Sequence, residues 1–386
     1  MPPALVVGGG IGGLATALAL ARAGRSVRVV EKGLEFGEIG AGLQLAPNAV
    51  QVLDRLGLMS EISRHAVFPN RLVWMDALDE TRITYVDLGE PFRRHYGYPY
   101  LVMHRGDLLN VLLEACRAEP RITLEASREV AGVEDLGNAA RARFTDGSAC
   151  ETELLIGADG LWSTVRGAVV TDAPAAEPYV AYRGTIPMER MSRHAGLDNV
   201  VMWVGPDMHF VQYPVRRGEL YNQVAVFKSR RYKPNSDDWG TVDELDAHYA
   251  QTCEYVRDCI SLMWRDKRWP MLDRSPILSW RRNRIVLMGD AAHAMLQYIA
   301  QGACQAIEDA QALADCVARA PGDVAAALAA YESARTLRTA RVQLTARAMG
   351  AFFHQQGVPA QVRNAMMRAR AADDYSMLDW LYGYRI

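Results

Sequence analysis

A glycine-rich turn near the N-terminus constrains the fold of this chain more than any other feature. The residues Gly8-Gly9-Gly10-Ile11-Gly12-Gly13 directly follow an apolar stretch, Ala4 to Val7, which is typical of a buried strand. The pattern then predicts a helix from Gly12 to Ala23 and a second strand from Ser26 to Glu31. A strand, a helix and a strand in this order form a βαβ unit, so the sequence predicts a parallel sheet.

Three of these glycines, Gly8, Gly10 and Gly13, make up a GxGxxG pattern. The first glycine allows the tight turn, the second lets backbone approach a pyrophosphate, and the third lets helix and strand pack closely. The helix N-terminus then offers free N–H groups to the phosphates. Glu31 ends the second strand, where a carboxylate accepts hydrogen bonds from a ribose and repels the 2′-phosphate of NADP. The turn therefore predicts a site for FAD or NAD.

The rest of the chain indicates a second domain inserted into the first. Short alternating segments from Arg71 to about Tyr100, and again over 178–230, are typical of antiparallel strands. A strand-glycine-helix pattern returns at Arg284 to Met288, and a helix is expected after it through Ala320. We expect an α/β fold, with a Rossmann-type domain, an inserted and mostly antiparallel sheet domain, and a helical C-terminus. The expected boundaries are 1–70, 101–177 and 271–345 for the first domain, 71–100 and 178–270 for the second, and 346–386 for the C-terminal helices.

Composition narrows the class of protein. Hydrophobic residues make up 50% of the chain and the net charge is −2, which favours a globular protein and gives no sign of a nucleic-acid partner. Six cysteines lack any CxxC or metal-ligand spacing, so we expect reduced thiols, a cytoplasmic location and no metal site. The apolar N-terminus is interrupted by glycines and lacks a cationic region before it, which argues against a signal peptide. No stretch approaches the roughly 18 apolar residues that a membrane span needs.

Two further motifs distinguish FAD from NAD. One is the run from Gly157 to Arg166, GADGLWSTVR, and the other is the run from Arg284 to His293, RIVLMGDAAH. Together with GxGxxG, in this order and spacing, they resemble the signatures of flavin-dependent aromatic hydroxylases with the para-hydroxybenzoate hydroxylase fold. The resemblance covers nearly the whole chain and implies FAD as cofactor.

The resemblance also implies which residues bind the cofactors. Asp159 and Gly160 would serve both FAD and the nicotinamide cofactor, and Gly289 and Asp290 would contact the ribityl chain and the polar edge of the flavin. Taken alone, Asp290 would be a helix N-cap. GxGxxG occurs once, and the resemblance implies that NAD(P)H docks transiently, with NADH as the favoured co-substrate. The remaining implied FAD contacts are Gln44 and Arg105.

Candidate substrate residues lie in the inserted domain and after the Gly-Asp motif. If 209–213 form a strand, then His209, Val211 and Tyr213 share one face, and a histidine suits deprotonation of a phenol. Taken alone, His209 would more often be a buried structural residue. A closer resemblance, to the 3-hydroxybenzoate 6-hydroxylases, implies that His209 acts as base while Tyr213 and Gln297 orient the ring. It is carried by His209 with Tyr213, by the segments 37–44, 296–298, 300–303 and 306–310, and by 379–384.

The reaction implied is hydroxylation of 3-hydroxybenzoate to 2,5-dihydroxybenzoate (gentisate) by NADH and O2 through a flavin C4a-hydroperoxide. Alternatives are a salicylate-type hydroxylase, a tailoring oxygenase of another aromatic compound, and a non-catalytic FAD-binding protein. Ala294 stands where the family usually has proline, which would allow the loop beside the flavin to differ. Apolar C-terminal helices suggest a homodimer.

Overall fold

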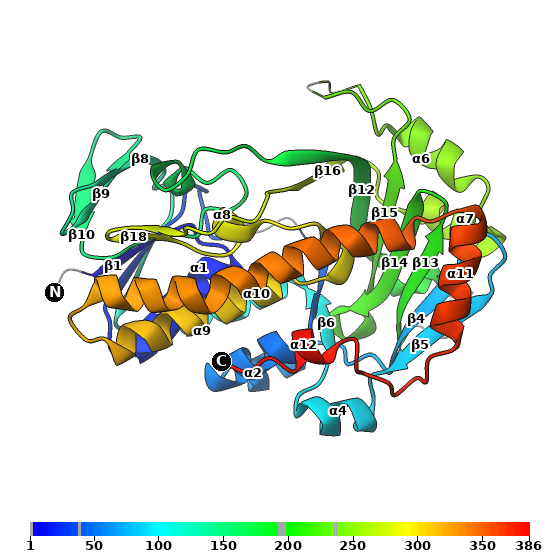
Figure 1. Ribbon diagram of the computed structural model, residues 1–386, viewed down its shortest axis with the longest axis horizontal. Helices are drawn as coiled ribbons and strands as arrows, with labels where there is room; N and C mark the ends of the chain where they lie inside the picture. Colours follow the sequence, from blue (N-terminus) through cyan, green and yellow to red (C-terminus); the bar gives the residue numbers. More distant parts are fainter. Residues whose placement is uncertain (1–2, 38–39, 192–197, 235, 237) are drawn as a thin grey trace.

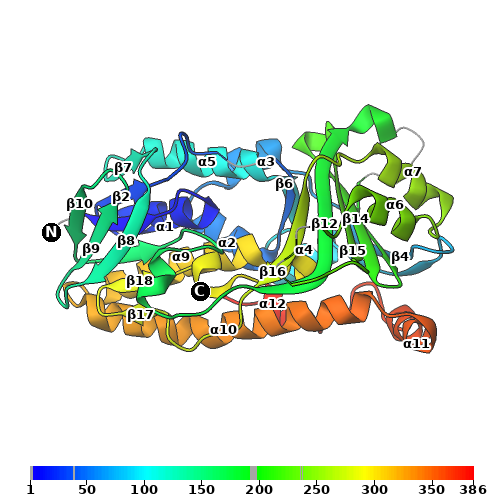
Figure 2. The same cartoon turned by 90° about the horizontal axis from the view of Figure 1, so that it is seen from above.

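A computed structural model describes residues 3–37, 40–191, 198–234, 236 and 238–386 of the chain. Glu38 and Ile39, in the glycine-rich segment 37–44, lie outside the described residues. The two main sheets occupy opposite ends of the molecule, and one long helix, α10 (Val324–Phe353), runs along both of them (Figures 1 and 2). Within the described residues, no helix is long and apolar enough to cross a membrane.

The first sheet confirms the predicted Rossmann-type unit. Its six strands lie in the order β17-β18-β11-β1-β2-β7, and all neighbours are parallel except β17 and β18. Helix α1 packs between α5 and α9, with its apolar face against the sheet. The strands are β1 (Ala4–Val7), β2 (Val27–Val30), β7 (Ile122–Glu125), β11 (Leu155–Gly157), β17 (Arg281–Arg282) and β18 (Ile285–Leu287), and the helices are α1 (Ile11–Arg22), α5 (Arg105–Arg117) and α9 (Gly302–Arg319).

The second sheet has seven strands in the order β16-β12-β15-β14-β13-β4-β5. Its neighbours are antiparallel except for β13 and β4, which are parallel. One face packs on α6 (Val242–Tyr249) and α7 (Glu254–Leu262), and the other faces the first domain and α10. The strands are β4 (Arg71–Asp76), β5 (Arg82–Asp87), β12 (Ala175–Pro187), β13 (Val200–Gly205), β14 (Met208–Val215), β15 (Leu220–Lys228) and β16 (Arg268–Asp273).

Smaller elements complete the molecule. The strands β8 to β10 form a three-stranded antiparallel sheet, and β3 pairs with β6. These strands are β3 (Gly42–Leu45), β6 (Leu101–His104), β8 (Val130–Asp135), β9 (Ala140–Phe144) and β10 (Ala149–Thr152). The remaining helices are α2 (Pro47–Arg55), α3 (Met59–His65), α4 (Glu90–Tyr96), α8 (Asp290–His293), α11 (Gly357–Arg368) and α12 (Asp379–Tyr382).

Two segments differ from the expected pattern. The single helix expected from the Gly-Asp motif through Ala320 is broken, because α8 ends at His293 and α9 begins only at Gly302. Ala300 between them has a φ of 53°, in the left-handed region that no helix continues through. Helix α10 runs without interruption across the boundary expected at 345/346. The interruption before α9 brings the segment 295–301 to the surface of a cavity.

Candidate active site

One cavity of about 690 Å³ lies between the two sheets. The three sequence motifs line one part of its wall, and strands β12, β14 and β16 with the loop after α8 line another part. Every predicted cofactor residue except Gly13 lies in this wall: Gly8, Gly10, Glu31, Gln44, Arg105, Asp159, Gly160, Gly289 and Asp290. The fold therefore brings the separate motifs to one place.

The glycine turn fits a pyrophosphate because no side chain would be tolerated in it. Gly8 has a φ of 109°, and a Cβ there would lie 2.3 Å from the carbonyl oxygen of Ala158. A Cβ on Gly13 would lie 2.0 Å from the oxygen of Gly8, so Gly13 packs helix to strand behind the wall. Gly10 precedes α1 without a side-chain cap, which leaves the N-terminal N–H groups of that helix available to phosphate oxygens.

Glu31 is held in place by backbone donors. Its Oε2 accepts a hydrogen bond from the N–H of Gly9 at 2.7 Å, and its Oε1 accepts one from Gly33 at 2.8 Å. Each carboxylate oxygen has a second lone pair, so the group can still accept hydrogen bonds from ribose hydroxyls. The residues present therefore fit the adenosine half of FAD.

Asp159 is tied to the turn that follows it. Its carboxylate accepts hydrogen bonds from Ser163 Oγ at 2.5 Å and from the N–H groups of Thr164 and Val165 at 2.8 and 3.1 Å. Burial raises the pKa of Asp159, and these hydrogen bonds oppose the rise. Gly160, with a φ of 78°, makes the turn possible.

Arg166, at the end of the Asp-Gly motif, connects it to the Gly-Asp motif. Its Nη1 donates to the carbonyl oxygens of Ala291 and Ala292 in α8, at 2.7 and 2.9 Å. The side chain is 1% exposed and forms an ion pair with Asp172. The role of Arg166 could not be predicted from the motif, because the two carbonyl groups that it binds lie 125 and 126 residues away along the chain.

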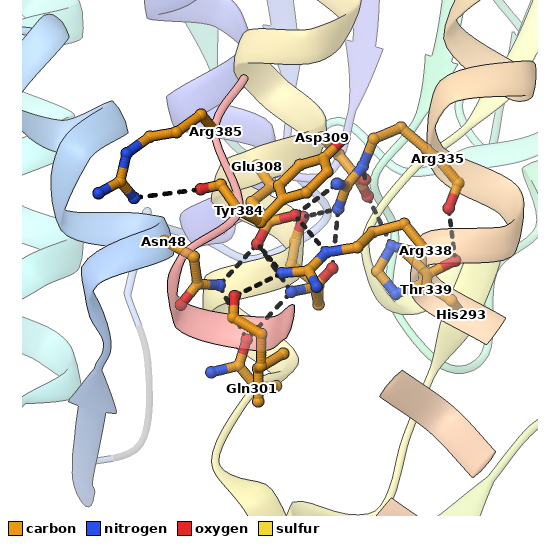
Figure 3. A network of polar contacts seen from close by, with 12 residues as sticks. Asn48, His293, Gln301, Glu308, Asp309, Arg335, Arg338, Thr339, Tyr384 and Arg385 are labelled. Atoms are coloured by element: carbon orange, nitrogen blue, oxygen red, sulfur yellow. Dashed lines mark hydrogen bonds and ion pairs between the residues drawn. The ribbon is translucent and has the colours of Figure 1, made fainter. Parts of the chain in front are cut away.

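A buried network of charged side chains anchors the Gly-Asp motif through Asp309. Figure 3 shows this network. The N–H of Gly289 donates to Asp309 Oδ2 at 2.9 Å, and His293 Nε2 lies 2.6 Å from the same oxygen. Asp309 Oδ1 accepts from Arg335 Nε at 2.7 Å. Asp290 begins α8 next to this anchor and is exposed to the cavity. His293 thus holds the loop.

The same network extends to the cavity wall and to the C-terminal segment. Arg335 also pairs with Glu308, which in turn accepts from Asn48 Nδ2 at 2.6 Å. Asn48 donates to Gln301, a wall residue, at 2.9 Å. Arg338 pairs with Glu308 and donates to the carbonyl oxygens of 380 and 381 (Figure 3). Two arginines therefore balance two acids in the buried interior, where an unpaired charge would be costly.

Side chains of the second sheet form the other end of the cavity. Tyr213 on β14 and Gln297 in the short 3₁₀ helix Gln297–Ile299 both line it, among the apolar side chains of Val211, Val224, Met271 and Leu296. Burial raises the pKa of Tyr213, and a hydrogen bond from the Gln44 side chain opposes the rise. Gln297 Nε2 is buried and has no hydrogen-bond partner among the described residues. Both groups are thus available to a polar ligand.

His209 shares a face of β14 with Val211 and Tyr213, as the alternation predicted, but it does not line the cavity. Its Nδ1 lies 2.8 Å from Nε2 of His354, and its ring is 5.4 Å from that of Tyr298. Burial lowers the pKa of His209 to about 3, so the imidazole is neutral near pH 7. The sequence could not indicate His354, which follows α10 and lies 145 residues away.

Ala294 directly precedes the wall residue Met295, and Arg105 is itself a wall residue. Ala294, in place of the family's proline, has a φ of −48° and ψ of 132°, a backbone conformation that proline itself adopts. Its carbonyl oxygen accepts a hydrogen bond from Gln343 Nε2 at 3.1 Å. This bond holds the loop although the proline ring is missing. Arg105 begins α5, and its N–H donates to the carbonyl oxygen of Ala41 at 2.9 Å, so this predicted FAD contact lies at a helix N-terminus.

Comparisons with known proteins agree with this geometry. The family model described as "FAD binding domain" matches residues 2–346. The 3-hydroxybenzoate 6-hydroxylase of Klebsiella oxytoca is 38% identical and covers 99% of this chain and 96% of its own length, and that of Polaromonas naphthalenivorans is 39% identical, covering 100% and 96%. The structure of Klebsiella pneumoniae HpxO with FAD and uric acid is similar with a TM-score of 0.86 and 25% identity, over 98% of this chain and 96% of that chain. The chain therefore belongs to the FAD-binding family of aromatic-ring monooxygenases.

Proposed function

We propose that this enzyme hydroxylates 3-hydroxybenzoate to 2,5-dihydroxybenzoate, with NADH and O2 as co-substrates. The observation that carries the proposal is the similarity to two 3-hydroxybenzoate 6-hydroxylases, at 38–39% identity over 99–100% of the chain. The cavity supports it, because its sheet-derived wall combines apolar side chains with a phenol and an amide, which suits a small phenolic acid.

When bound, FAD would take up the electrons of NADH and transfer oxygen to the substrate. The protein positions the aromatic ring. The Gln44 side chain opposes the rise in the pKa of Tyr213, as a donor to the phenol oxygen does, so the O–H proton of Tyr213 is proposed to be donated into the cavity. The free Nε2 of Gln297 is a second donor. Two fixed donors restrict the orientation of the ring, and the apolar walls around them exclude water.

His209 is the proposed base for the phenolic proton. Its imidazole is neutral, and in the tautomer whose Nδ1–H donates to His354, Nε2 is left to accept a proton. The residue lies one inward-facing position beyond Val211, about 7 Å along the strand. A substrate hydroxyl must therefore extend past Val211 to contact it.

Purified enzyme tests this directly, by NADH oxidation with a panel of hydroxybenzoates and chromatographic identification of the products. We expect 3-hydroxybenzoate to raise the rate sharply and to yield 2,5-dihydroxybenzoate. His209→Ala is expected to lower kcat at least a hundredfold, the usual contribution of a general base. His65→Ala, at a surface histidine paired with Glu61, is the control. Formation of catechol from salicylate would instead assign a salicylate-type hydroxylase, and no stimulation by any hydroxybenzoate would favour a tailoring oxygenase.

A homodimer and a cytoplasmic location remain predictions. Several apolar side chains on the C-terminal helices are exposed in the single chain, among them Leu337 and Leu344 on α10 and Val358 and Met366 on α11. Such side chains are usual at subunit contacts. Light scattering coupled to size-exclusion chromatography would measure the mass in solution.

A further inference from the structure

Among the described residues, the seven-stranded sheet contributes one charged side chain to the cavity wall. Arg183 lies in the middle of β12, between β15 and β16. Alternation along β12 places Ala181 and Arg183 on the face that lines the cavity, while Val180 and Tyr182 pack into the core beneath the opposite face. The arginine side chain is half-buried and lines the cavity.

The surroundings of Arg183 hold its guanidinium in one place. The guanidinium carbon lies 5.1 Å from the centre of the Trp269 ring, a cation–π distance. Val224 faces Arg183 across the strand pair, and Val211 also belongs to the wall. The positive charge of Arg183 acts electrostatically on Tyr213, because it opposes the rise that burial causes in the pKa of the Tyr213 phenol. Arg183 and Tyr213 therefore belong to the same end of the cavity.

Charge at this end of the cavity is of one sign. Among the described wall residues, the other cations, Lys32, Arg105 and Arg128, accompany the dinucleotide motifs and the strand β8 region, and none comes from the seven-stranded sheet. The acids of the described wall are likewise at the cofactor end: Glu31, Glu129, Asp159 and Asp290. A partly desolvated guanidinium next to apolar and aromatic side chains is suited to a planar anion of the ligand.

We propose that Arg183 binds the carboxylate of the aromatic substrate and so selects aromatic acids over neutral phenols. This rests on the proposed function insofar as the substrate is a hydroxybenzoate. The carboxylate then lies at β12, and the donors of Tyr213 and Gln297 are left for the rest of the ring. Two separate polar anchors fix the ring in its plane, which is what hydroxylation at a single carbon requires.

Binding to the FAD-loaded enzyme tests the proposal without turnover, through the change in the flavin spectrum on titration. We compare 3-hydroxybenzoate with its neutral counterpart, 3-hydroxybenzamide, in wild type, Arg183→Gln and Arg183→Lys. Loss of a charge-assisted hydrogen bond predicts a Kd for the acid that is about 10- to 100-fold higher in Arg183→Gln, and a change below about threefold for the amide. Arg183→Lys keeps the charge, so its Kd for the acid should lie between those of wild type and Arg183→Gln. Arg94→Gln, at an exposed arginine on α4, is the matched control.

The outcomes separate this inference from the proposed function. If wild type binds salicylate instead of 3-hydroxybenzoate, the same comparison with salicylate and salicylamide applies, and a selective loss for the acid would support Arg183 while the proposed substrate fails. An equal loss for acid and amide would overturn the inference, because Arg183 would then only shape the cavity. Unchanged binding of the acid, or no binding of any aromatic carboxylate to wild type, would also overturn it.

Discussion

The two ends of the cavity are constructed from different parts of the polypeptide. At the cofactor end the wall is organised around backbone turns and helix starts: the turn at Gly8, the N-terminus of α1 and the start of α8. At the substrate end it consists of side chains from β12, β14 and β16, which come together only in the folded sheet. The comparison teaches that cofactor binding is encoded in short segments, whereas substrate selection depends on long-range packing.

The largest expected effect is on the cofactor end, from Gly13→Ala. The added Cβ would meet the backbone oxygen of Gly8 at 2.0 Å, and backbone there cannot yield without opening the turn. We expect a cost above about 3 kcal/mol, more than overpacking against a flexible side chain, and purification of the protein without FAD. Flavin absorbance per protein is the measurement.

Gly167→Ala is the matched control for this change. A Cβ there meets nothing within 4 Å, and Gly167 lies in the same region as the Asp-Gly motif. FAD content should remain at the wild-type level. A Gly13→Ala protein that kept its flavin would show that the side chains, and not the backbone turn, hold the cofactor, and the contrast between the two ends would be lost.

Sequence reasoning succeeded where the structure depends on neighbours along the chain. The strand before Gly8, the helix after it and the acid at Glu31 follow local rules of turn geometry and alternation, and the structure has them in that order. The face shared by Val211 and Tyr213 was predictable for the same reason. The interruption between α8 and α9 was not, since it depends on contacts such as that of Ala294 with Gln343.

Contacts between distant segments account for what the sequence could not predict. His209 has its partner on the segment after α10, and Arg166 binds the carbonyl oxygens of α8. Arg183 was unremarked because an arginine within a strand is usually solvated, and only the packing of β12 against the cavity gives it another role. In each case the residue type was visible, and the partner that fixes its role was not.

The second expected effect is a loss of stability at low pH, and it arises at the substrate end. Burial lowers the pKa of His209 to about 3 and that of His354 to about 2, with the charges of His209, His248, Arg363 and Lys228 adding to the effect on His354. Below about pH 6.5 the unfolded chain binds protons at both positions and the native chain does not. Stability is therefore lost as pH falls, by roughly 2 kcal/mol for each histidine between pH 7 and pH 5.

Urea unfolding at pH 7, 6 and 5, with FAD in constant excess, measures this slope. His354→Gln removes one histidine of this pair and should reduce the loss by the share of one histidine, roughly 2 kcal/mol, whatever the stability of the variant at pH 7. His65→Gln, at a surface position, should leave the slope as in wild type. If His354→Gln and wild type lose the same free energy between pH 7 and pH 5, the buried pair is not the source of the acid sensitivity.

The smallest expected effect is that of Gly42→Ala. It adds the same methyl group at the substrate end that Gly13→Ala adds at the cofactor end. A Cβ on Gly42 would lie 2.5 Å from Cε2 of Tyr213 and 2.7 Å from Cγ of Asn222, so the added methyl group displaces a side chain of the substrate wall. Overpacking of this kind costs about 1–3 kcal/mol. We expect FAD to be retained and the KM for the aromatic acid to rise about tenfold, because the Tyr213 hydroxyl no longer faces the ring.

Steady-state kinetics together with flavin content distinguish this result from a general loss of structure. Tyr213→Phe removes the hydroxyl without adding volume, so Gly42→Ala combined with Tyr213→Phe should raise KM little more than Tyr213→Phe alone, since both act through one group. If the two substitutions raise KM additively, Gly42 acts on the cofactor through Asn222. The Oδ1 of Asn222 accepts a hydrogen bond from the N–H of Gly42 at 2.7 Å. Non-additivity with full flavin content would place Gly42 among the substrate residues, although it lies in a glycine-rich segment of the kind that elsewhere in this chain serves the cofactor.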